Sequence, residues 1–220
     1  MREPSPIPER IAKVDPILAA STLAEDAARY ARLAIELGAS AARVIQPAQI
    51  VIDERVTMKC AVPKCFGYGA CANCPPHAPR PEEVRRAVER FGTGVVVRLD
   101  VPPAVIVRDR ATMEERLAAY RTMFQIVSAV ESAAFYDGHY LAVGFAAGSC
   151  KSTLCYNVDC TVLAQEKCRH DLLARPSMEA VGMDCFAMAA ALGWEMYPVG
   201  ISAPAERVPA GALMGVVLVD

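Results

Sequence analysis

The placement of cysteine constrains this chain more than any other feature of its sequence. Eight of the nine cysteines fall into two groups of four. Thiolates are soft ligands that suit iron–sulfur clusters or zinc, and four of them complete either kind of site. The sequence therefore predicts two metal sites, one within residues 59–81 and one within residues 148–177. Their expected ligands follow the spacings Cys60-x4-Cys65-x5-Cys71-x2-Cys74 and Cys150-x4-Cys155-x4-Cys160-x7-Cys168.

The spacing within each group favours iron over zinc. Structural zinc sites usually present two Cys-x2–4-Cys pairs separated by a longer spacer. Here x4 is the commonest spacing, and each group runs continuously. Cys74-Pro75 also resembles the Cys-Pro ending of bacterial ferredoxin motifs. We therefore expect two [4Fe-4S] clusters as cofactors, with zinc as the alternative.

Composition and charge exclude several other classes of protein. The net charge is −2, and no block of five basic residues offers a surface for nucleic acid. No apolar stretch reaches the roughly 18 residues of a membrane-spanning helix, and the proline-rich N-terminus is unlike a secretory signal. We therefore expect a cytoplasmic protein without membrane insertion. In such a reducing compartment, cysteines serve metal or redox chemistry better than disulfides.

Helical periodicity and β-branched runs alternate along the rest of the chain. Thr22 and Glu25 predict the capped start of a helix that ends before Gly38. Further helices are expected from Pro81, from Thr112 and over residues 177–192. Strands are expected at residues 94–101, 140–145 and 213–219.

This order of elements predicts an α/β or α+β fold. We expect a single mixed sheet flanked by helices, with the two cysteine-rich loops inserted between elements. Residues 1–20 contain four prolines and are expected to form a Pro-rich lead-in. Residues 21–220 then form a single domain that carries both metal sites.

Three segments of the sequence together carry a resemblance to a known family. They are Lys59-Cys60 through Cys65, Tyr68-Gly69-x4-Cys74-Pro75-Pro76-His77, and Cys168-Arg169-x5-Arg175-Pro176-Ser177-Met178-Glu179-Ala180-Val181-Gly182-Met183-Asp184. They look like the family called domain of unknown function 2284, described as predicted metal-binding proteins of mostly anaerobic microbes. The resemblance spans roughly residues 50–194 and implies metal binding rather than a particular activity.

Two cysteines depart from the pattern of that family. Cys71 lies in a spacer expected to vary, which makes Cys60, Cys65 and Cys74 the firmer ligands of the first site. Cys185 stands where an aliphatic residue is expected, and we interpret it as a small buried apolar side chain. Arg175 is expected either to bind an anion or to form a structural salt bridge.

The fourth ligand of the first site separates the candidate functions. Four cysteine ligands close the site, which favours an electron-transfer or redox subunit that serves an anaerobic enzyme system through a redox partner protein. Three ligands would leave one iron open to a small sulfur- or oxygen-containing substrate, as in an enzyme. A zinc-organised interaction module is the third possibility. The sequence shows no set of residues that identifies a catalytic group.

Overall fold

The computed structural model describes residues 11–107, 110–200 and 203–220, so half of the expected lead-in, residues 1–10, lies outside the described residues. One four-stranded sheet with the order β1-β2-β4-β3 organises the chain. All three neighbouring pairs are antiparallel. The single sheet flanked by helices is confirmed, in its α+β form, but the described strands pair in antiparallel fashion rather than as the expected mixed sheet. The strands are β1 (Ala41–Ile45), β2 (Thr93–Val101), β3 (Val143–Phe145) and β4 (Gly211–Val219).

The two central strands are buried on both faces and divide the core in two. β2 and β4 pair along their whole length, from Thr93 opposite Val219 to Val101 opposite Gly211. Because side chains alternate across a strand, Val217 and Val219 face one core while Val216 and Leu218 face the other. Each face of the sheet therefore needs its own cover of helices.

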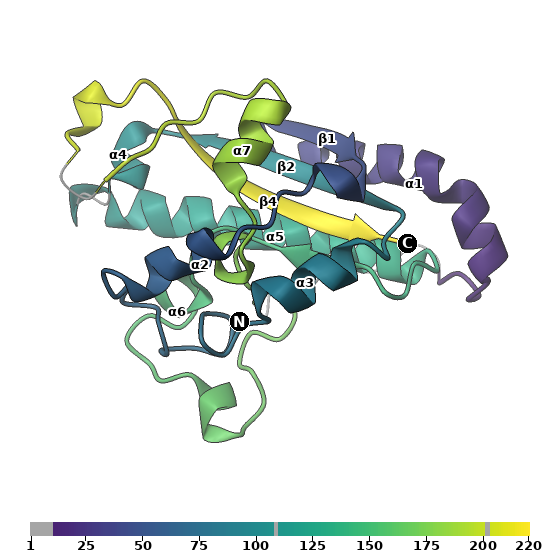
Figure 1. The fold of residues 1–220 in the computed structure, drawn as a ribbon, viewed down its shortest axis with the longest axis horizontal. Coiled ribbons are helices and arrows are strands. Elements are labelled where there is room, and N and C mark those ends of the chain that lie inside the picture. Colours follow the sequence, from purple (N-terminus) through teal and green to yellow (C-terminus); the bar gives the residue numbers. More distant parts are fainter. Residues whose placement is uncertain (1–10, 108–109, 201–202) are drawn as a thin grey trace.

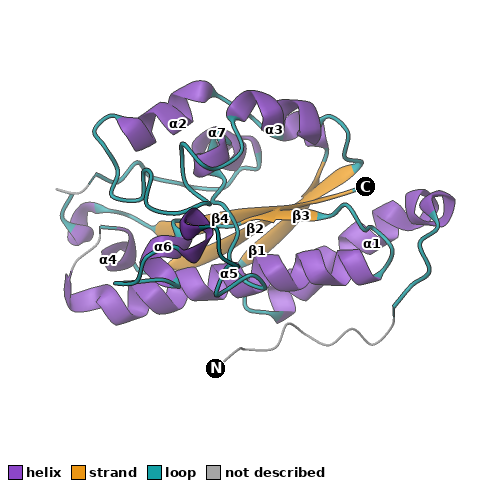
Figure 2. Ribbon diagram, turned by 90° about the horizontal axis from the view of Figure 1, so that it is seen from below, coloured by secondary structure: helices purple, strands orange, loops and turns teal. Residues whose placement is uncertain are grey.

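Two long helices cover the first face. They are α1 (Pro16–Glu36) and α5 (Met113–Tyr136), and Figure 2 shows both on the same side of the sheet. α5 approaches the sheet closely at Gly215, where a Cβ would lie 2.7 Å from a Val127 methyl carbon. Short helices α4 (Pro103–Ile106) and α6 (Cys150–Thr153) lie at this side too.

Three shorter helices cover the second face. They are α2 (Glu54–Ala61), α3 (Pro81–Val88) and α7 (Cys185–Ala191) (Figure 2). α3 begins at Pro81, as predicted, and buries Val84 and Val88 against this core. In the described part of the chain, none of the helices combines the length and apolar character that a bilayer crossing requires.

Two helix boundaries differ from the sequence prediction. α1 begins at Pro16, because the Asp15 carboxylate accepts hydrogen bonds from the first backbone N–H groups; the predicted start at Thr22 was wrong. The helix expected over residues 177–192 is divided. A 3-10 turn (Glu179–Val181) stops at Gly182, whose φ is 89°, and α7 then starts with Asp184 as its cap.

A polar cluster ties α1 to the neighbouring elements. His139 is buried, and its two ring nitrogens contact the Asp26 carboxylate on α1 and the backbone carbonyl of Asp220 after β4. Arg29 bridges Asp26 and Asp137, at 2.6 and 2.8 Å. The last residue of the chain and the end of α5 are thereby joined to one helix.

Candidate metal centre

The two cysteine loops lie beside each other beyond the end of β3, at the end of the sheet where β4 begins. The first loop leaves α2, whose last turn carries Cys60, and runs to α3. The second follows β3 and starts with α6, whose first residue is Cys150. Figure 1 shows the second loop in green, projecting away from the sheet below α6.

Three thiols from the two loops come together in the core. The Cys71 and Cys150 sulfurs are 3.9 Å apart, although 79 residues separate them in the sequence. The Cys74 sulfur lies 3.3 Å from the Ser149 hydroxyl, and that hydroxyl lies 3.7 Å from Cys71. The three cysteines are between 1% and 9% exposed. We call Cys71, Cys74 and Cys150 the buried thiol group.

Two polar side chains complete the surroundings of the buried thiol group. Ser149 lies between Cys71 and Cys74, and the Asn73 amide donates to the Cys150 sulfur at 3.6 Å. Hydrogen bonds of this kind orient thiolate ligands and tune the potential of a bound cluster. The sequence did not predict a role for either residue. The only indication in the sequence is position: Ser149 precedes Cys150, and Asn73 lies between Cys71 and Cys74.

Charge within the buried thiol group is unevenly shared. Cys150 and Cys74 direct their thiols at the Cys71 sulfur, and these contacts lower the pKa of Cys71. The same contacts raise the pKa of Cys74 and of Cys150, and burial adds to both shifts. Three thiolates this close repel one another, so all three ionise together only where a cation offsets their charge.

The remaining cysteines of the first loop lie nearer the surface. Cys60 and Cys65 are half-buried and line a cavity together with Cys74. Burial raises the pKa of Cys60, and the neighbouring charge of Cys65 adds to this effect. The structure thus brings Cys60 and Cys65 to one side of Cys74, and places Cys71 with Cys150.

The other three cysteines of the second loop form a half-buried set of their own. Burial raises the pKa of Cys155, and the neighbouring thiols of Cys168 and Cys160 raise it further. Two cationic side chains hold this loop by donating hydrogen bonds to its backbone carbonyls. The Lys151 ammonium donates to the Val158 carbonyl at 2.7 Å, and the Arg169 guanidinium donates to the Asp159 carbonyl at 2.6 Å.

Arg175 anchors the end of the second loop. Its guanidinium nitrogen Nε lies 2.7 Å from the Glu131 carboxylate on α5, which also accepts the Gly144 N–H at 2.8 Å. Of the two roles expected for Arg175, the structural salt bridge is the one observed. Cys185 is buried, as expected, with its sulfur 3.9 Å from that of Met178.

The chemistry of the donors suits a thiolate-bound metal or cluster. Eight cysteines lie in two adjoining loops, and none of the nine thiols forms a disulfide. Three of the eight, the buried thiol group, pack together in the core. Within residues 11–107, 110–200 and 203–220, no group of three or more His, Cys, Asp or Glu side chains is arranged to hold a single metal ion.

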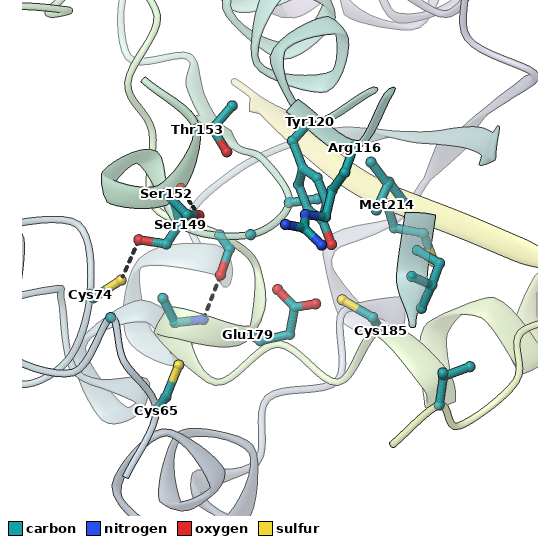
Figure 3. A pocket seen from close by; sticks show the side chains of 18 of the residues that line it. Cys65, Cys74, Arg116, Tyr120, Ser149, Ser152, Thr153, Glu179, Cys185 and Met214 are labelled. Atoms are coloured by element: carbon teal, nitrogen blue, oxygen red, sulfur yellow. Dashed lines mark hydrogen bonds between the residues drawn. The ribbon is translucent and has the colours of Figure 1, made fainter. Parts of the chain in front are cut away.

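A cavity of about 560 Å³ opens beside the first loop. Cys60, Cys65 and Cys74 form part of one wall, and α5 with the start of β4 forms another. Figure 3 shows Arg116 and Tyr120 of α5 on one side and Glu179 on the opposite side. Glu179 lines this cavity and is exposed. Sequence reasoning did not single out Arg116 or Glu179, although Glu179 lies within the third segment quoted above.

The comparison with protein families agrees with this chemistry. A model of DUF2284, described as a predicted metal-binding protein, matches residues 43–219. No curated protein and no solved structure shows significant similarity to the chain. The match covers both cysteine loops, all four strands but the first two residues of β1, and every helix after α1. The chain belongs to the DUF2284 family of predicted metal-binding proteins.

Proposed function

We propose that this protein binds two [4Fe-4S] clusters and acts as an electron-transfer subunit of a cytoplasmic, anaerobic redox system. The proposed ligands are the two groups of four cysteines defined by the sequence. The contact between Cys71 and Cys150 carries the proposal, because it brings thiols of two distant loops together inside the core. Soft donors gathered in this way are characteristic of cluster sites.

The proximity of the two loops supports electron transfer. Since Cys150 of the second loop contacts Cys71 of the first, clusters bound by the two groups would be neighbours. Neighbouring clusters also occur in two-cluster ferredoxins, where a cysteine of one motif binds the cluster of the other. An electron could then pass from one site to the other within this chain.

The surface of the second loop supports docking of a redox partner. Cys155, Cys160 and Cys168 are only half-buried, so a cluster held there would lie close to solvent. Apolar side chains exposed on the same loop provide contact area for another protein. They are Tyr156, Val158, Val162, Leu163 and Leu172.

Single cysteine variants test the ligand assignment. Cys71→Ala and Cys150→Ala are each expected to remove one cluster, which corresponds to about four irons per chain. Cys185→Ala is the matched control, because Cys185 is buried but belongs to neither loop. Iron content and electron paramagnetic resonance of protein purified without oxygen provide the measurements. Unchanged iron in both loop variants would contradict the proposal.

One observation favours a second candidate, an enzyme whose first cluster has an open iron. The cavity is lined by Cys60, Cys65 and Cys74 but not by Cys71. A cluster held by the three lining cysteines would present its fourth iron to a small sulfur- or oxygen-containing substrate. Retention of the first cluster in Cys71→Ala, with loss of a cluster in Cys74→Ala, would select this candidate.

A further inference from the structure

The cavity beside the first loop has the composition of a small-molecule site. Its volume of about 560 Å³ lies within the range of pockets that enclose small ligands. Such pockets combine apolar walls with a few convergent polar groups. The apolar wall here is formed by α5, the start of β4 and neighbouring segments. Its members include Ile106, Met113, Leu117, Leu213 and Met214.

Arg116 brings a positive charge to this cavity. It projects from the first turns of α5 (Figure 3), and its Nη1 atom is buried without a hydrogen-bond partner. Among the described residues it forms no salt bridge with any carboxylate. A buried donor that is left unpaired is costly, so an anion that reached this guanidinium would be held by it.

Glu179 gives the opposite side of the cavity a different character. Its carboxyl points into the cavity across from Arg116 (Figure 3), and Ser177 and Cys185 lie next to it. The negative charge of the Glu179 carboxylate repels an anionic ligand on this side of the cavity. An anionic group therefore finds its favourable position at Arg116, and the uncharged part of the same molecule extends along the apolar wall.

We propose that this cavity binds a small organic acid, with its anionic group on Arg116 and its apolar body against α5 and β4. The inference goes beyond the proposed function, because it requires no iron at the cysteines. It rests on the cavity, the unpaired Nη1 atom of Arg116 and the apolar wall. A molecule bound in this way would also lie beside Cys60, Cys65 and Cys74.

A pair of fluorescent probes that differ in charge tests the proposal. The probes are 8-anilino-1-naphthalenesulfonate, an anion, and N-phenyl-1-naphthylamine, its uncharged counterpart. Titrations use the full chain purified without oxygen. Arg116→Met is expected to weaken binding of the anion by about tenfold or more and to leave binding of the uncharged probe unchanged. Arg121→Met, an exposed position on the same helix, should change neither.

A second comparison distinguishes two possible roles of Arg116, direct contact with the anion and neutralisation of the Glu179 charge. Glu179→Gln is expected to strengthen binding of the anionic probe severalfold, because it removes a like charge. Arg116→Met should still weaken that probe by about tenfold in the Glu179→Gln background. If the effect of Arg116 disappears in this background, the guanidinium only neutralises Glu179, and the proposal is wrong. The same holds if Arg116→Met binds both probes as the natural chain does.

Two further results keep the test decisive. If Arg116→Met loses both probes, Arg116→Lys decides, since restored binding of the anion supports the proposal and its continued loss contradicts it. Iron is measured in the same samples. Iron-free protein with the expected charge dependence would contradict the proposed function alone, and iron-loaded protein without that dependence would contradict this inference alone.

Discussion

Gly67 shows how tightly the first loop packs around the buried thiol group. A Cβ at this position would lie 3.2 Å from the Cys74 sulfur and 3.5 Å from the Ser149 hydroxyl. The sequence places Gly67 two residues after Cys65, within the first loop. It could not show that the contact reaches Ser149, because that residue comes from the other loop.

Gly67→Ala is therefore expected to displace Cys74 and to disturb the first metal site. We expect a loss of about 1–3 kcal/mol in the free energy of unfolding, typical of overpacking, together with lower metal occupancy. Gly200→Ala is the control, because nothing lies within 4 Å of a Cβ there. Urea unfolding and metal analysis provide the measurements. Equal stability and metal content in the two variants would contradict this account of the loop.

The Glu131 carboxylate joins α5, β3 and the second loop at one point. It accepts from both Arg175 and Gly144, and the two side chains of the salt bridge are largely buried. Glu131→Ala is expected to lower the free energy of unfolding by about 2–4 kcal/mol, because it leaves a buried guanidinium and an N–H group without this partner. Chemical denaturation measures the change.

An exposed ion pair of the same loop supplies the matched control for Glu131. Lys167 and Asp171 lie 2.8 Å apart, but the lysine side chain is 77% exposed. Lys167→Ala should therefore cost no more than about 0.5 kcal/mol. A similar cost for the two variants would mean that Arg175 does not anchor the loop.

At the scale of elements, periodicity predicted the long helices and the central strands well. α5 and α3 begin where Thr112 and Pro81 indicate, and β2 and β4 match their β-branched runs within two residues. The errors have local causes. Asp15 caps α1 ahead of Thr22, and Gly182 divides the last helix because its left-handed backbone, with φ of 89°, ends the first turn.

The polar cluster around His139 makes the attachment of α1 sensitive to acid. Burial alone would raise the pKa of Asp26, but hydrogen bonds from Thr22, Arg29 and His139 outweigh it, and the pKa is lowered. The ionised carboxylate is therefore favoured in the folded chain. Its contribution to stability is complete above the unfolded pKa of about 3.9 and is lost as pH falls through the lower, folded value.

Asp26→Asn is expected to lower the free energy of unfolding at pH 7 by roughly 1–2 kcal/mol. The difference from the natural chain should shrink as pH falls below about 4, because both chains then lack the charge. Glu25→Gln, at an exposed position on the same helix, is the control. Urea unfolding between pH 3 and pH 8 tests this. A difference that stays constant across that range would show that the charge of Asp26 is irrelevant.

At the scale of the molecule, the sheet with its two layers of helices supports the cysteine loops at one end. The sequence predicted the loops, because the cysteine spacing is local. It could not predict that Cys150 meets Cys71, since that contact depends on how β3 and the first loop pack across 79 residues. The sequence did not indicate that Arg116 and Glu179 face one cavity, because that arrangement also depends on long-range packing.

Removal of metal should loosen the loops before it unfolds the sheet. The loops contain few regular elements, whereas β2 and β4 pair over nine residues in the core. Metal-depleted protein is expected to be cut first within residues 154–175 by a limiting amount of protease, with the sheet retained. Mass spectrometry of the fragments, with and without metal, tests this. Identical cleavage patterns would contradict a structural role for the metal.

Iron and acid-labile sulfide per chain, measured in protein purified under strict exclusion of oxygen, test the central claim most directly. Two [4Fe-4S] clusters predict about eight irons and eight sulfides per chain, with two reversible one-electron signals. Colourless protein with about two zinc ions per chain, or with cysteines that bind no metal, would contradict it.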